Sequence, residues 1–189
     1  MDNVRVGIEY HVRKTHYEES VLGVSFHTTL IALAALLGME VFAWFAHKYI
    51  MHGWGWGWHQ SHHQRHNRRL EKNDLYVVVF SLVVVGLFAL GAARWPVLMP
   101  IATGITLYGV LYSLFHDGLV HRRWPLRWQP KSGYLRRLIL AHRIHHAVHT
   151  REGAVSFGFL WAEDPEKLKL RLLENHPRHE QKTSRPGSS

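Results

Sequence analysis

The chain alternates between long apolar runs and shorter polar segments rich in histidine. The apolar runs cover residues 21–46, 75–93 and 97–115. A helix rises about 1.5 Å per residue, so even the 19-residue runs extend over roughly 28 Å, which is close to the hydrocarbon thickness of a bilayer. Apolar runs of this length are unusual in a small soluble protein. The pattern therefore predicts an all-α integral membrane protein, a helical bundle with three spans.

The second and third runs are joined by the three residues Arg94-Trp95-Pro96. Pro96 cannot continue a regular helix, and Trp95 is a residue type that prefers the membrane interface. Residues 75–115 are therefore predicted to form a transmembrane hairpin. The segments before residue 75 and after residue 115 should consequently lie on the same face of the membrane.

The remaining segments give the expected organisation of the chain. Residues 1–20 are polar and form an N-terminal extension without the pattern of a cleavable signal peptide. Residues 21–163 form one membrane domain. Within it, residues 154–162 are apolar but too short to span, so they are expected to form a buried strand, a re-entrant piece or an interfacial segment. Residues 164–189 are predicted to contain a short amphipathic helix, which begins at Asp164-Pro165, and a disordered polar tail.

The distribution of charge predicts the orientation. The formal net charge is +9, and lysine and arginine are frequent in residues 47–74 and 116–163, whereas the 94–96 connector has one arginine. The positive-inside rule then places the histidine-rich face in the cytoplasm. The basic residues of the N-terminal extension would lie on the opposite side and disagree with this orientation. No nucleic-acid-binding motif accompanies the charge, so no nucleic-acid partner is expected.

Ten of the seventeen histidines fall into four clusters, two with the spacing H-x4-H and two with H-x2-H-H. The clustered histidines are His47 and His52; His59, His62 and His63; His116 and His121; His142, His145 and His146. One metal ion rarely needs more than three or four protein ligands, so ten imidazoles predict two metal ions held at one membrane face. The chain has no cysteine, which excludes iron–sulfur and thiolate ligation.

The spacing constrains how a helix could present these ligands. Residues at i, i+3 and i+4 share one helix face, so each H-x2-H-H motif could offer two or three imidazoles to one site. Residues at i and i+5 lie about 140° apart on an ideal helix. In each H-x4-H pair, either the helix ends between the two histidines or each histidine serves a different metal. Glycines at positions 53, 55 and 57 favour a helix end near His52.

Neutral imidazoles without cysteine fit iron, copper or zinc, and two irons are suited to activating O2. Asp74, Asp117 and Glu152 are candidates to orient the imidazoles through their second nitrogen. Asn73-Asp74 is also a good helix N-cap. Seven histidines outside the motif spacing are not expected to be ligands: His11, His16, His27, His66, His149, His176 and His179.

The four clusters and their surroundings resemble the bacterial beta-carotene hydroxylases of the fatty acid hydroxylase superfamily. The resemblance covers about residues 35–162 and rests on motifs that go beyond the superfamily's histidine pattern. These motifs are Gly38-Met39-Glu40, HKYIMHGWGWGWHQSHH from His47, Asn73-Asp74-Leu75-Tyr76, HDGLVH from His116, AHRIHHAV from Ala141 and VSFGF from Val155. Residues 1–20 depart from the family, and Gln64 stands where the family commonly has glutamate.

The resemblance implies a multi-pass inner-membrane monooxygenase with two non-heme irons and O2 as co-substrate. The ten clustered histidines carry over as the iron ligands. The implied reaction is hydroxylation at C3 of the beta-ionone rings of beta-carotene to give zeaxanthin, with keto-carotenoids as further substrates toward astaxanthin. A ferredoxin-type protein would supply the electrons. Trp54, Trp56, Trp58 and Phe115 are candidates to line the access of the carotenoid from the lipid bilayer, with anchoring at the membrane interface as the alternative role.

Other functions compete with this interpretation. A membrane fatty acid or lipid hydroxylase or desaturase would use the same metals and differ in substrate. A bis-histidine haem electron carrier would need only two axial histidines for each haem, usually within the spans. A metal transporter would place ligands at mid-membrane, where only His27 and Glu40 come close.

Overall fold

The computed structural model describes residues 2–64, 70–125 and 128–175, with side chains described at residue 23 and from residue 25 onward. Every regular element in these ranges is helical, which confirms the predicted all-α class. The elements are α1 (Asp2–Phe45), η1 (Ala46–Trp54), α2 (Trp56–His63), α3 (Asp74–Ala93), α4 (Leu98–Tyr112), η2 (Ser113–Val120), α5 (Gly133–His145) and α6 (Pro165–Asn175). Two of them, η1 and η2, are π-helices.

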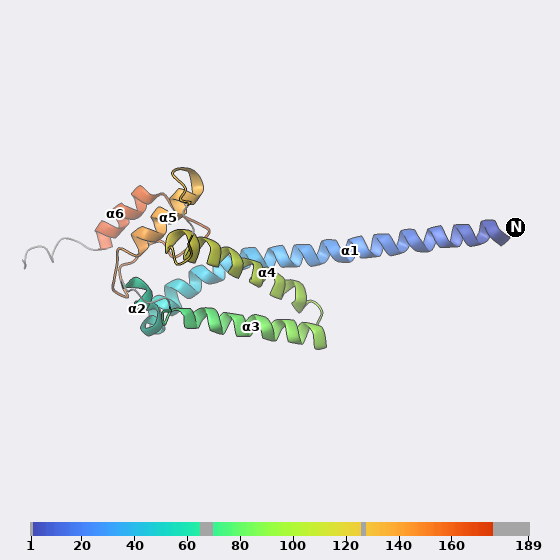
Figure 1. Cartoon of the computed structure of the whole chain (residues 1–189), viewed down its shortest axis with the longest axis horizontal. Coiled ribbons are helices and arrows are strands. Elements are labelled where there is room, and N and C mark those ends of the chain that lie inside the picture. Colours follow the sequence, from blue (N-terminus) through green and yellow to red (C-terminus); the bar gives the residue numbers. More distant parts are fainter. Residues whose placement is uncertain (1, 65–69, 126–127, 176–189) are drawn as a thin grey trace, which may run out of the picture.

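Three helical segments are long and apolar enough to cross a membrane: Ser25–Trp54, Asp74–Ala93 and Leu98–Val120. They correspond to the three predicted spans, although the first and third continue further toward the histidine clusters. The connector between α3 and α4 makes the predicted hairpin, and α4 returns along α1 (Figure 1). The helical backbone of α1 begins at Asp2, so the predicted N-terminal extension continues the first span as one long helix.

Hydrophobic side chains on these helices face outward. Leu82, Val83 and Val85 on α3 are all more than half exposed, and few residues of the three spans are buried within the chain. Exposure of such an apolar surface to water would be unfavourable, whereas contact with lipid avoids this cost. The main buried cluster lies instead in the head of the molecule, between α5, α6 and the segment 154–162.

Gly104 sets the distance between α1 and α4. A Cβ atom at this position would lie 2.2 Å from the carbonyl oxygen of Ala32 and 2.8 Å from the Cβ of Ala35. Small residues allow such close approach of helices in membranes. Because both obstacles are backbone or a short side chain, a larger residue would force the two helices apart.

We therefore expect Gly104→Val to destabilise the bundle by about 1–3 kcal/mol, the cost typical of overpacking. Thermal unfolding in detergent would measure this change. Gly109→Ala on the same helix is the matched control, because nothing lies within 4 Å of a Cβ atom built there. Equal midpoints for the two variants would contradict the predicted close approach.

The head of the molecule consists of η1, α2, η2, α5, α6 and an irregular segment, residues 151–162, that follows α5 (Figure 1). This segment contains Ser156 at a positive φ of 63°. The backbone N–H of Glu166 donates to Asp164 Oδ1 at 2.8 Å, so Asp164 caps α6. The predicted alternatives for residues 154–162 included a strand, but the structure has neither strand nor helix there.

Candidate metal centre

The two H-x4-H pairs lie on or at the end of π-helices. His47 and His52 are within η1, while His116 is within η2 and His121 follows its last residue. A π-helix bonds residue i to residue i+5, and the His121 N–H donates to the His116 carbonyl at 2.9 Å. Residues five apart therefore share one face. This corrects both sequence-based alternatives, because the helix does not end between the histidines and each pair contributes to one group.

Nine of the ten clustered histidines form two groups, in each of which the ligand nitrogens lie within 4.8 Å of one another. The first group contains His47, His52, His59, His63 and His145; the second contains His62, His116, His121 and His142. Most of these imidazoles are buried. The sequence predicted two metal positions, and the structure provides two groups of suitable geometry.

His146 lies beside the second group. Its ring centroid is 4.7 Å from that of His62, 4.8 Å from His121 and 4.6 Å from His142, all of the second group, and 4.4 Å from that of His63 of the first group. Its Nε2 is buried and has no hydrogen-bond partner within the described residues. A buried imidazole nitrogen without a partner is costly unless a ligand binds it. His146 is thus suited to be the fifth member of the second group.

The H-x2-H-H motifs are divided between the groups, contrary to the expectation that each could serve one site. In α2, His59 and His63 belong to the first group and His62 to the second. In α5, His145 belongs to the first group and His142 to the second. Each helix therefore lies across the boundary between the two groups and fixes their separation.

The first group is oriented mainly by backbone. His52 Nδ1 donates to the Arg151 carbonyl at 2.8 Å, and His145 Nδ1 donates to the Val155 carbonyl at 2.9 Å. His47 and His63 similarly contact the carbonyls of Phe157 and Val148, at 3.1 and 2.7 Å. Since a carbonyl only accepts hydrogen bonds, each Nδ1 carries the proton and each Nε2 has a free lone pair.

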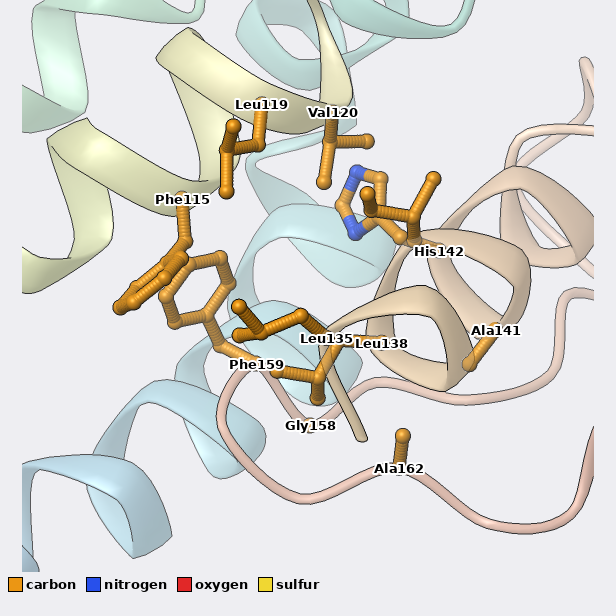
Figure 2. Close-up of a pocket in the computed structure, with 11 residues that line it drawn as sticks. Phe115, Leu119, Val120, Leu135, Leu138, Ala141, His142, Gly158, Phe159 and Ala162 are labelled. Atoms are coloured by element: carbon orange, nitrogen blue, oxygen red, sulfur yellow. The ribbon is translucent and has the colours of Figure 1, made fainter. Parts of the chain in front are cut away.

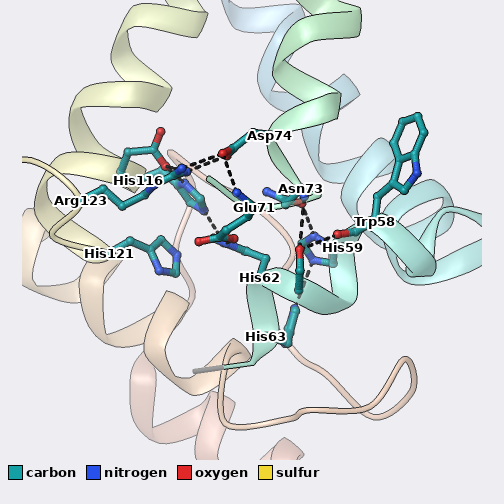
Figure 3. Close-up of polar contacts among 12 residues, drawn as sticks. Trp58, His59, His62, His63, Glu71, Asn73, Asp74, His116, His121 and Arg123 are labelled. Atoms are coloured by element: carbon teal, nitrogen blue, oxygen red, sulfur yellow. Dashed lines mark hydrogen bonds and ion pairs between the residues drawn. The ribbon is translucent and has the colours of Figure 1, made fainter. Parts of the chain in front are cut away.

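The Asn73 side chain orients the fifth member of the first group. Its Oδ1 accepts a hydrogen bond from His59 Nδ1 at 2.8 Å (Figure 3). Asn73 also precedes α3, but its side chain makes no capping hydrogen bond to that helix. The predicted capping role of Asn73 was therefore wrong, because a buried imidazole takes its acceptor.

Carboxylates orient two members of the second group. His62 Nδ1 donates to Glu71 at 2.9 Å (Figure 3). His116 Nδ1 donates to Asp117 at 2.8 Å. Asp117 was predicted for this role, whereas Glu71 was missed. Glu71 is nine residues from His62 in the sequence, and its local sequence carries no signal of the contact.

The other two predicted acids do not contact the clustered histidines in this way. Asp74 forms a two-pronged ion pair with Arg123, at 2.7 and 2.8 Å, and accepts from the Glu71 N–H (Figure 3). Asp74 therefore fixes the Glu71 backbone and the Arg123 side chain rather than an imidazole. Glu152 is exposed and pairs with Arg151. Surface ion pairs of this kind contribute little to stability.

The paired imidazoles test whether these groups fit a metal. His52 Nε2 and His145 Nε2 are 3.2 Å apart, although both nitrogens carry lone pairs. The same opposition occurs between His62 Nε2 and His116 Nε2 at 3.0 Å, where carboxylates fix the Nδ1 protons. Two lone pairs repel each other unless a cation lies between them. The donor set therefore fits a bound metal ion in each group.

Burial keeps these imidazoles available as ligands at neutral pH. Desolvation lowers the pKa of His63 to about 4, and the pKa of His121 to about 4, with smaller contributions from neighbouring charges. The pKa values of His142 and His145 are also lowered well below the usual range, mainly by burial. Neutral imidazole is the form that binds metals.

The acids that orient the second group offer a direct test. We expect Glu71→Gln and Asp117→Asn to weaken metal binding at the second group by roughly 10–100-fold, the effect usual for such outer partners. Competition with a chelator, followed by metal analysis, would measure the affinity. Glu152→Gln is the matched control, since its carboxylate is exposed. An equal loss of metal affinity in Glu152→Gln would contradict the proposed role of Glu71 and Asp117 in orienting the imidazoles.

Glu40, within the first candidate span, joins this span to the irregular segment. Its Oε1 accepts from the backbone N–H groups of Phe159, Leu160 and Trp161 at 2.8, 2.8 and 3.0 Å. Its Oε2 accepts from the Tyr108 hydroxyl on α4 at 2.8 Å. The same segment supplies the carbonyls that orient His47 and His145. Glu40 thus anchors part of the histidine surroundings to the membrane helices.

Aromatic rings pack against the first group. Phe157 packs against His47, His52 and His145 of the first group, and Trp56 packs against His52 and His63. Of the other tryptophans considered for substrate access, Trp54 is 85% exposed and Trp58 packs on Tyr76. Only Trp56 of these three contacts the clustered histidines among the ring contacts of the described residues.

An apolar cavity lies beside the second group (Figure 2). Phe115, Leu119 and Val120 line it from the α4–η2 side, Leu135, Leu138 and His142 from α5, and Phe159 from the irregular segment. His142 brings the cavity into contact with the second group. Phe115, predicted to lie near the substrate, is part of this wall.

The histidines excluded by sequence spacing lie elsewhere or are not described. His27 is exposed in the first span and contacts the Gly23 carbonyl, and His149 is exposed after α5. Neither belongs to the two groups. His66, His176 and His179 lie outside the described residues, and the side chains of His11 and His16 are not described.

Comparison with known proteins agrees with the fold and the histidine groups. Residues 32–163 match the model of the fatty acid hydroxylase family. The chain therefore belongs to the fatty acid hydroxylase family, whose members are membrane hydroxylases. No solved structure matches the chain.

Within this family the chain is similar to beta-carotene hydroxylases. It is 55% identical over 148 residues to the beta-carotene hydroxylase of Pantoea ananas, covering 78% of this chain and 84% of the relative. It is 56% identical over 144 residues to that of Paracoccus sp. (strain PC1), covering 76% and 89%. A chloroplastic beta-carotene 3-hydroxylase of Arabidopsis thaliana is 34% identical over 133 residues, covering 68% and 44%.

Proposed function

We propose that the protein is a beta-carotene 3-hydroxylase, a membrane monooxygenase that hydroxylates C3 of the beta-ionone rings. The opposed imidazole lone pairs at the ends of apolar spans carry this proposal, because they fit metal ions held beside a lipid-soluble substrate. The similarity to beta-carotene hydroxylases over most of both chains supports the substrate class.

Two non-heme irons are the metals that best suit this donor set and reaction. The ten clustered histidines would hold them, five in the first group and five, with His146, in the second. Iron bound there would supply the reductive activation of O2 that hydroxylation of an unactivated C–H bond requires. The chain's own residues orient the imidazoles, keep them neutral and surround them with aromatic rings that exclude water.

The carotenoid is proposed to reach the centre from the bilayer. Its polyene would lie along the exposed apolar surface of the spans, and one ionone ring would reach the head of the molecule. Because one centre must meet the two rings in turn, a mono-hydroxylated carotenoid should precede zeaxanthin. Keto-carotenoids carry similar rings, so we include them among the proposed substrates, leading toward astaxanthin.

The histidine-rich head is proposed to face the cytoplasm, with the protein spanning the inner membrane several times. The excess of lysine and arginine in the head over the α3–α4 connector supports this orientation. A cytoplasmic head would also be accessible to a ferredoxin-type protein, which we propose as the electron donor.

Expression in a host that produces beta-carotene tests the function. We expect a mono-hydroxylated product first and zeaxanthin later, detected by chromatography of the pigments. Labelled fatty acids supplied to the same cells should remain unhydroxylated. Unchanged beta-carotene in cells that contain the folded, iron-loaded protein would contradict the substrate assignment.

A C-terminal reporter tests the orientation separately. A reporter active only in the cytoplasm should show activity, and one active only in the periplasm should not. The opposite result would place the centre away from a cytoplasmic donor and would contradict the proposed orientation and donor together.

A further inference from the structure

The two histidine groups have different electrostatic surroundings. In the first group, the Nδ1 acceptors are four backbone carbonyls and the amide oxygen of Asn73, all of which are neutral. In the second group, Glu71 and Asp117 supply carboxylate acceptors. A carboxylate acceptor makes an imidazole a stronger electron donor than a neutral acceptor does. A metal in the second group is therefore better stabilised in its more oxidised state.

Tyr112 adds a proton donor to the second group. Its ring stacks on His116, with centroids 4.4 Å apart and planes 22° apart, and its hydroxyl lies 3.2 Å from His116 Nε2. Because His116 Nδ1 donates to Asp117, Nε2 has the lone pair and the Tyr112 hydroxyl donates to it. A metal bound to His116 would use the same lone pair. The hydroxyl would then be left beside the metal without this acceptor.

The surroundings of the first group are of another kind. Phe157, which packs against three of its five imidazoles, has no hydrogen-bonding atom in its side chain. Near the second group, Phe159 packs against His116 and Tyr112 and lines the apolar cavity beside His142 (Figure 2), and the hydrogen-bonding group there is the Tyr112 hydroxyl. The cavity and the Tyr112 hydroxyl thus converge on the second group.

We propose that the metal of the second group is the one that binds the exogenous oxygen ligand, and that Tyr112 donates a hydrogen bond to this ligand. This assignment rests on the proposed function insofar as the centre holds two irons. It goes further because it makes the two metals unequal and gives Tyr112 a role that neither the histidine motifs nor their spacing indicates.

Azide binding to the iron-loaded, oxidised protein tests the role of Tyr112. Azide is a small anionic ligand of ferric iron, and its binding can be followed by visible absorption. Tyr112→Phe removes only the hydroxyl, and we expect its azide dissociation constant to rise about ten-fold, as for the loss of one hydrogen bond to a charged ligand. Trp56→Phe, beside the first group, should leave the constant within about two-fold of the wild-type value.

Iron content is measured for each variant, so a change in affinity is separated from loss of metal. An unchanged azide affinity in Tyr112→Phe at full iron content would overturn the proposal. A ten-fold loss in Trp56→Phe would overturn it too, because it would place the ligand at the first group. A tyrosinate-to-iron absorption band present without azide and absent in Tyr112→Phe would show that Tyr112 is itself a ligand.

The wild-type protein separates this proposal from the proposed function. Failure of the wild-type protein to hydroxylate beta-carotene would contradict the proposed function, whereas the azide measurements test the assignment of the ligand to the second group without any carotenoid.

Discussion

His145→Ala is expected to abolish nearly all hydroxylation, with product formation lowered by well over 100-fold. The imidazole is fully buried, its Nε2 lies 3.2 Å from that of His52, and its Nδ1 is fixed by the Val155 carbonyl. Losing a partner of a ligand typically weakens metal binding by about 10–100-fold, and losing the ligand itself should cost more. Pigment analysis and metal content of the purified protein would measure the two effects together.

The matched control is His149→Ala, four residues along the same segment. His149 is exposed and belongs to neither histidine group. We expect it to keep near wild-type activity and its full metal content. If His149→Ala were as inactive as His145→Ala, or if His145→Ala retained both metals and activity, the assignment of ligands by group would be wrong.

The spans and the ten clustered histidines could be predicted because their signals are local. Apolar runs of suitable length mark a span whatever surrounds them, and the hairpin at Pro96 placed all four clusters on one side. The repetition of two spacings singled out ten of the seventeen histidines. The structure gathers nine of the ten into two groups and places His146 beside the second.

The division of the ligands could not be predicted from an ideal α-helix. Spacing of i, i+3 and i+4 predicted that each H-x2-H-H motif could serve one site. In the structure, α2 and α5 each contribute histidines to both groups. Spacing of i, i+5 was interpreted on a 3.6-residue turn, whereas η1 and η2 have the wider π-helical turn. Such turns are rare and often occur at functional sites, where tertiary contacts stabilise them.

The partners of the imidazoles were harder still to predict. Glu71 and Asn73 contact His62 and His59 from nine and fourteen residues away in the sequence. The carbonyls of residues 148–157 act through their backbone, which leaves no mark in the sequence. Glu40 lies about 120 residues from the N–H groups that it accepts from. A carboxylate in an apolar span signals a functional role, but only the fold identifies its partner.

Glu40→Ala is expected to give the largest loss of stability outside the histidines. The substitution leaves three backbone N–H groups, those of Phe159, Leu160 and Trp161, without their acceptor. The first two donors are partly buried and that of Trp161 is exposed. At about 1–3 kcal/mol for each unsatisfied buried donor, we expect a loss of roughly 2–4 kcal/mol in the free energy of unfolding. Release of this segment should also disturb the Phe157 and Val155 carbonyls and weaken metal binding at the first group more than at the second.

Two variants separate the anchoring role from a general effect of the substitution. Glu40→Gln keeps a carbonyl oxygen that can accept the same N–H groups, so it should recover much of the stability and of the metal binding. Tyr108→Phe removes only the bond to Oε2 and should cost about 1–3 kcal/mol, the value for one hydrogen bond to a charged group. Thermal unfolding in detergent, with metal content measured on the same samples, would check both. Wild-type stability and metal content in Glu40→Ala would show that the three N–H contacts do not hold the segment, and an equal metal loss from both groups would contradict its selective link to the first.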